Sequence, residues 1–72
     1  MSNAAWIRNR IEASPDQFVV HTQLLPLAET MAQQCRRELA QAQSSAIANI
    51  YHRMLRDLEE ILNQYQHHAT AA

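Results

Sequence analysis

Histidine is the residue type in this chain best suited to metal binding or acid–base chemistry. The four histidines are His21, His52, His67 and His68, and no two of them stand four residues apart. A helix therefore presents no pair of imidazoles to one metal ion, and the adjacent His67 and His68 point about 100° apart. These two suit the last turn of a helix, where positive charge is favourable. We predict no metal site.

The single cysteine and the acidic residues have structural explanations. Cys35 lies between Met31 and Leu39 in an apolar pattern, where a thiol acts as a small hydrophobic group and burial weakens its nucleophilicity. Three acids flank or oppose the apolar face of their predicted helix and are expected in solvent: Asp57, Glu59 and Glu60. The chain has no glycine, which excludes a glycine-rich phosphate loop. We predict no catalytic residue, no cofactor and no enzyme activity.

Two stripes of apolar residues at helical spacing organise the rest of the chain. The first contains Leu24, Ala28, Met31, Cys35, Leu39 and Ala42. The second contains Ile47, Ile50, Met54, Leu58, Ile61 and Tyr65. The stripes mirror each other about the Ser44–Ser45 bond, so a fold-back there sets each apolar residue level with another. We expect an all-α protein built on an antiparallel hairpin of helices over about 24–43 and 45–67.

A second topology satisfies the same pattern. No glycine or proline comes after Leu27, so nothing forces the helix to stop, and two continuous helices crossing antiparallel would pair the same residues between chains. The sequence Gln43-Ser44-Ser45 interrupts good helix formers, and either serine can cap a new helix. Helices of globular proteins are also usually far shorter than forty residues. The hairpin is favoured, while the tail over 69–72 is expected to fray.

The N-terminal region carries a short third helix. Residues 2–4 match a scar that tag removal often leaves, although a methionine precedes them. Apolar residues recur at helical spacing after it: Trp6, Ile7 and Ile11. A helix over about 4–13 is too short to be stable alone, so it must dock. It either covers the open end of the hairpin near Tyr65, packs on a second subunit, or serves as a partner-binding arm anchored by Trp6.

The segment between this helix and the hairpin has two interpretations. Ser14 suits an N-cap, Pro15 the first helical position, and Gln17 completes a capping box. Pro26 then removes one backbone hydrogen bond from any helix that contains it. Residues 15–25 either belong to one helix with the first stripe, kinked at Pro26, or form a short helical turn before a fresh start near Leu25.

Length and helix shape favour self-association. The 72 residues make one small domain, whose core is too small to be strongly stabilising by itself. The apolar arc of the second helix spans about 140°, more than one narrow partner helix covers. We therefore predict a homodimer of the four-helix-bundle type. The expected self-association or partner interface consists of Ile47, Tyr51, Leu55, Leu58 and Leu62.

The predicted function is a small protein–protein interaction module: a dimeric adaptor, regulator or chaperone-like subunit. The alternative is a nucleic-acid-binding regulator that holds phosphates with an arginine band on the hairpin: Arg36, Arg37, Arg53 and Arg56. The net charge of −1 argues against this alternative. No apolar run has membrane-spanning length, so no membrane partner is expected, and a lone cysteine suits the cytoplasm.

Overall fold

The computed structural model describes the backbone of residues 3–71 and the side chains of residues 4–65. The elements in chain order are α1 (Asn3–Ala13), α2 (Gln17–Val19), a π-helical turn η1 (Val20–Leu24), α3 (Leu25–Gln41) and α4 (Ser45–Ala71). The described residues contain no strand, so the prediction of an all-α fold is confirmed. His67, His68 and the tail fall beyond the described side chains, although the backbone of α4 extends to Ala71, past its predicted end.

The second helical segment is capped by Asp16 and not by Ser14 as predicted. The Asp16 carboxylate accepts a hydrogen bond of 2.9 Å from the Phe18 amide, and α2 begins at Gln17. The Ser14 amide instead donates to the Ile11 carbonyl at 3.2 Å, which closes the end of α1. Asp and Ser cap equally well, so the residue left free by the preceding helix takes the role.

Pro26 is accommodated by the π-helical turn that directly precedes α3. The Leu25 amide donates to the carbonyl of Val20, five residues back, where an α-helix would use the residue four back. We attribute this wider turn to Pro26, which lacks an amide proton and whose ring crowds the carbonyl four residues before it. Helical backbone runs from Gln17 to Gln41, so the single-helix interpretation is the nearer one, with a π turn before the proline.

The π turn also keeps the buried side chains in line. At about 100° per residue, Val20 would lie about 80° from Ala28 around the helix axis. Each residue in the wider turn advances by a smaller angle, and Val20, Leu24 and Ala28 are all buried. One helix thereby contributes to the core along most of its length.

A short connection over residues 42–44 joins α3 to α4. Ala42 adopts an extended conformation, which ends α3. The Ser44 hydroxyl then accepts a hydrogen bond of 3.2 Å from the Ile47 amide, and the Ser44 carbonyl accepts one of 3.1 Å from Ala48. Ser44 is thus the cap, one of the two serines that the sequence offered for this role.

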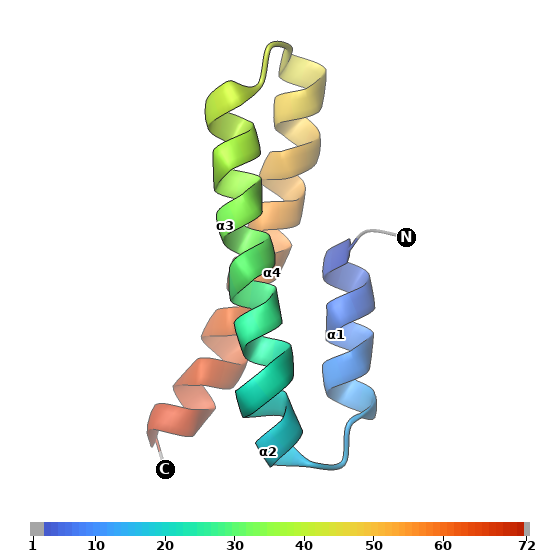
Figure 1. The fold of residues 1–72 in the computed structure, drawn as a ribbon, viewed down its shortest axis with the longest axis vertical. Helices are drawn as coiled ribbons and strands as arrows, with labels where there is room; N and C mark the ends of the chain where they lie inside the picture. The colour runs from blue at the N-terminus through green and yellow to red at the C-terminus, as the bar shows by residue number, and fades with distance from the viewer. Residues whose placement is uncertain (1–2, 72) are drawn as a thin grey trace.

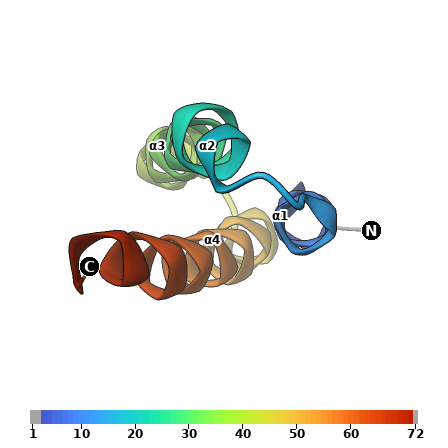
Figure 2. The same ribbon diagram turned by 90° about the horizontal axis from the view of Figure 1, so that it is seen from below.

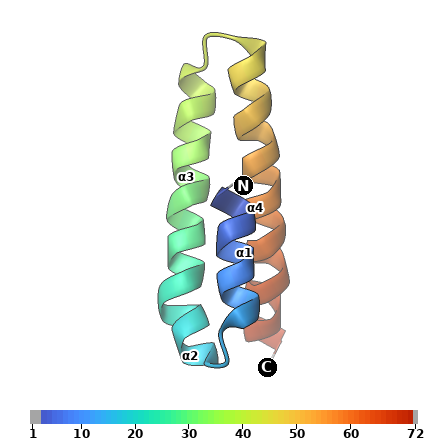
Figure 3. The ribbon, with the colours of Figure 1, turned by 90° about the vertical axis from the view of Figure 1, so that its right-hand side faces the viewer.

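The three long helices lie side by side, with α3 and α4 antiparallel and α1 against them (Figure 1). Seen along its length, the molecule places α1 on one side of the α3–α4 pair, at the corner of a triangle (Figure 2). Figure 3 shows that α1 covers only the half of the α3–α4 gap that is far from the 42–44 connection. This covered half is called here the lower half. The half nearest the connection, called here the upper half, has no third helix in front of it.

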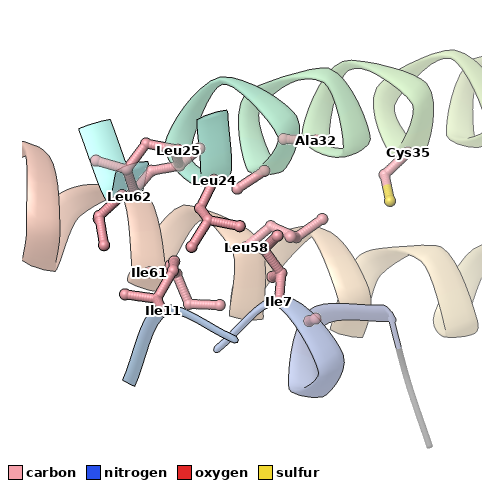
Figure 4. Packing of buried hydrophobic residues seen from close by; sticks show 12 residues of the cluster. Ile7, Ile11, Leu24, Leu25, Ala32, Cys35, Leu58, Ile61 and Leu62 are labelled. Carbon is pink, nitrogen blue, oxygen red and sulfur yellow. The ribbon is translucent and has the colours of Figure 1, made fainter. Parts of the chain in front are cut away.

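The core lies where the three helices meet (Figure 4). From α1, Ile7 lies beside Leu58 and Ile11 beside Ile61. Three of these four side chains have no exposed surface, and Ile11 is 3% exposed. The buried cluster consists of Ala4, Ile7, Ile11, Val20, Leu24, Leu25, Ala28, Ala32, Cys35, Leu58, Ile61 and Leu62. The N-terminal helix is therefore part of the core.

The apolar layers nearest the connection are open. The mirror pattern placed Leu39 against Ile50 and Ala42 against Ile47 as core layers. In the structure Ile50 is 59% exposed and Ile47 46% exposed, while Leu39 and Ala42 are half-buried. These layers have only α3 and α4 to cover them, because α1 lies along the lower half alone (Figure 3).

Candidate interaction surface

A shallow groove of about 240 Å³ lies in the upper half of the α3–α4 pair. Its lining residues, called here the open groove, are Met31, Gln34, Cys35, Glu38, Tyr51 and Met54. On α3, Met31 and Cys35 belong to the stripe that continues from Ala28. On α4, Met54 and Tyr51 are one and two turns before Leu58. The groove therefore continues the core beyond the point where α1 begins.

Two exposed isoleucines border the open groove on the side of the connection. Ile47 and Ile50, called here the apolar tip, occupy the first turns of α4. Ile50 is one residue before Tyr51 and one helical turn before Met54, so the tip and the groove form a continuous apolar surface on α4. Solvent exposure of several adjacent large apolar side chains is typical of an interface.

The predicted interface residues occupy three different environments. Leu58 and Leu62 are buried in the core, Tyr51 and Leu55 are half-buried, and Ile47 is exposed. Leu55 lines a different groove, on the side of α4 that carries His52 and Glu59. The structure thus gathers Ile47 and Tyr51 on one surface and separates the other three from it.

Sequence reasoning missed Met31, Ile50 and Met54 as surface residues, because all three were assigned to the hairpin core. Ile50 and Met54 share a helical stripe with Ile61, which α1 covers. Met31 shares one with the buried Ala28 and Cys35. The available signal was the length of the N-terminal helix: a segment of eleven residues cannot cover an α4 that begins at Ser45 and is more than twice as long.

The predicted partner arm divides into buried and exposed residues. Ile7 and Ile11 are core residues, which leaves only Trp6, 46% exposed, on the surface of α1. The Arg10 guanidinium carbon lies 5.9 Å from the centre of the Trp6 ring, a cation–π contact within the same helix. Arg8 also reaches α4, with its guanidinium 3.9 Å from the Glu60 carboxylate. Both contacts are on the surface and contribute little to stability.

The four arginines predicted to form a band do not share one site. Arg36 pairs with Glu59 across the helices, with 3.4 Å between guanidinium nitrogen and carboxylate oxygen. Arg53 and Arg56 line a groove of about 290 Å³ together with His52, Leu55 and Glu59. Arg37 is exposed on α3. None of the four arginines thus lies among the lining residues of the open groove.

Cys35 is the group whose acidity the fold changes. Its side chain points from α3 toward α4, and the residue is almost completely buried (Figure 4). Burial raises the pKa of the Cys35 thiol above its ordinary value; the charge of Arg36 lowers it and that of Glu38 raises it, both to a smaller extent. A raised pKa lowers the thiolate fraction at neutral pH, which is the opposite of an activated nucleophile.

We expect native Cys35 to react with an aromatic disulfide reagent at least about ten-fold more slowly than the same chain in denaturant, because attack needs an accessible thiolate. The native rate should also keep rising with pH beyond the ordinary thiol pKa, since the folded-state pKa is raised. Spectrophotometric release of the reagent's thiol measures both rates. Rapid labelling at neutral pH in the native protein would contradict the burial of Cys35.

Within residues 4–65, no three side chains of the metal-ligating types come together as a candidate site. Nor does any helix in the described part of the chain have both the length and the apolar character that crossing a bilayer requires. Comparison with protein-family models, with curated proteins and with solved structures finds no match to this chain.

Proposed function

We propose that the protein is a dimeric protein–protein interaction module, acting as an adaptor, regulator or chaperone-like subunit without catalysis. The observation that carries this proposal is the open groove with its apolar tip, an apolar surface that continues the core and lacks a covering helix. In helical bundles such apolar faces are buried against further helices. In the proposed dimer, a second chain supplies these helices. The single, buried cysteine supports a cytoplasmic setting.

The molecule exposes more surface than a compact globular protein of its mass. Its accessible surface is 5214 Å², whereas a compact protein of 8.3 kDa exposes about 4,600 Å². Its radius of gyration is 13.0 Å, against about 11 Å for a compact chain of 72 residues. The molecule is thus elongated, with extents of 41 × 24 × 15 Å, which leaves helix faces that a further chain can cover.

We also propose that each chain keeps its own α3–α4 fold-back in the dimer, in place of one continuous helix crossing a second. Two local features support this proposal. Ala42 leaves the helical conformation, and the Ser44 hydroxyl accepts a hydrogen bond from the Ile47 amide in the first turn of α4. A continuous helix would have to give up this cap.

Sedimentation equilibrium tests the proposed dimer with two variants of equal charge at neighbouring positions. Wild type should have twice the mass of the chain at micromolar concentration. Ile50→Asp should raise the dissociation constant at least about a hundred-fold, because a buried unpaired carboxylate costs about 3–5 kcal/mol. Asn49→Asp places the same charge on an exposed residue and should remain dimeric. A folded wild-type monomer, or equal effects of both variants, would refute dimerisation through this surface.

Nucleic-acid binding is the second candidate, and the observation that favours it is the groove shared by His52, Arg53 and Arg56. Arg36 is already neutralised by Glu59, which reduces the number of arginines free to hold phosphates. Binding that weakens steeply with added salt, and that is lost in Arg53→Ala, would establish this function in place of the first.

A further inference from the structure

The open groove and the apolar tip are complementary parts of one surface. The groove is a concavity between α3 and α4, lined on α4 by Tyr51 and Met54. The tip is a pair of exposed isoleucines that begins one turn earlier on α4, toward the connection. The centres of the two features lie about four residues apart, roughly 6 Å along the helix. A surface that carries both a protruding and a recessed apolar part can pair with its own copy.

We propose that two copies of this chain pack antiparallel through their upper halves, so that the apolar tip of each enters the open groove of the other. This inference rests on the proposed dimer and specifies its geometry. A two-fold axis perpendicular to the helices, passing between Ile50 and Tyr51, sets each tip level with the partner's groove. A two-fold axis parallel to the helices would set tip against tip and groove against groove, leaving both grooves unfilled.

The position of α1 fixes how far the two copies overlap. Ala4, Ile7 and Ile11 already occupy the lower half of the same face and are buried there. A partner sliding further would meet the first turn of α1, so its 42–44 connection stops beside that turn. The overlap is then the stretch from about Cys35 to Ala42 on α3, about 11 Å long. In this arrangement the α3 and α4 helices of each chain cover the upper half of the other chain, where α1 does not reach.

The distribution of charge selects this face. The rim of the open groove carries one acid, Glu38, whose carboxylate accepts a hydrogen bond of 2.9 Å from Gln34 on the same helix. That bond lies along the edge of α3 and leaves the apolar floor free. Elsewhere on the surface lie the Arg36–Glu59 pair between α3 and α4 and the groove on α4 with Arg53 and Arg56, and a partner there would have to desolvate these charges. A second copy of this chain therefore packs on the α1 face.

Interchain distances from pulsed electron–electron resonance test the arrangement. One spin label is placed at Gln43→Cys, beside the connection, and another at Gln17→Cys, at the opposite end of the molecule. Both positions are exposed, and each variant carries Cys35→Ala, whose dimeric mass is checked first. From the helical rise, antiparallel half-overlap predicts about 20 Å between the two labels at 43 and about 65 Å between the two at 17.

Each other outcome overturns a different statement. Distances below about 30 Å at both positions indicate a parallel dimer, which refutes the antiparallel arrangement and retains the proposed dimer. A short distance at position 17 with a long one at position 43 places the interface at the lower half. This result also refutes the proposed arrangement and retains the dimer. A monomeric mass without an interchain signal refutes the dimer itself. Dilution with unlabelled chain must reduce the signal amplitude of every distance that is assigned between chains.

Discussion

Ile61→Ala will remove most of the stability of this protein. Ile61 is fully buried where α1, α3 and α4 meet, and truncating such a side chain costs about 3–4 kcal/mol through lost burial and the cavity left behind. A domain of 72 residues is stabilised by roughly 4–11 kcal/mol in total, and small domains lie at the lower end. Urea denaturation followed by far-ultraviolet circular dichroism measures the loss, at one protein concentration for all variants.

Phe18→Ala is the matched control for this experiment. It removes an even larger apolar side chain, but Phe18 is 72% exposed, so its truncation should cost less than about 1 kcal/mol. Equal losses in the two variants would show that Ile61 does not lie in the core described above.

Ile7→Asp will unfold the whole chain and not just α1. Ile7 is fully buried beside Leu58, so the substitution places an unpaired carboxylate in the core at a cost of about 3–5 kcal/mol. Detaching α1 to relieve that cost exposes Leu58 and Ile61, the largest buried side chains of α4. Circular dichroism should show loss of far more helix than the eleven residues of α1 contain.

Trp6→Asp provides the comparison at the neighbouring residue. Trp6 lies on the outer side of α1, and an acidic residue in the first turns of a helix is electrostatically favourable, so the change should be within about 1 kcal/mol. If α1 were a free arm, Ile7→Asp would have an equally small effect and would leave α3 and α4 folded.

Helices and their caps could be predicted from the sequence where they depend on residues that are close together in the chain. The period of the stripes identified the helices, and a serine in Gln43-Ser44-Ser45 marked the break that the Ser44 hydroxyl caps. The span of α1 was predicted to within one residue. At the start of α2, two competent caps stood close together, and the choice of Asp16 depended on how α1 ended.

Features that depend on packing between distant residues were not predictable in the same way. The mirror symmetry of the stripes indicated levels of contact but not how many helices cover each level, so Ile50 was placed in the core and Leu62 at an interface. Both assignments changed once α1 docked beside Ile61 and left the upper half uncovered. The π turn was also hidden, because propensity at Pro26 signals only that regular helix is disfavoured there.

The π-helical turn has a consequence for changes in chain length. A turn bonded five residues back holds one residue more than an α-helical turn, as if a residue had been inserted into a regular helix. Deletion of one of the exposed residues His21, Thr22 or Gln23 would therefore keep Val20 on the buried side of the helix without altering α3 beyond it, at the cost of placing the proline after a regular turn. Within α3 or α4, the same one-residue deletion would turn every later side chain about 100° away from the core. We therefore expect the fold to tolerate single-residue changes in length only in η1 and in the connections over 14–16 and 42–44.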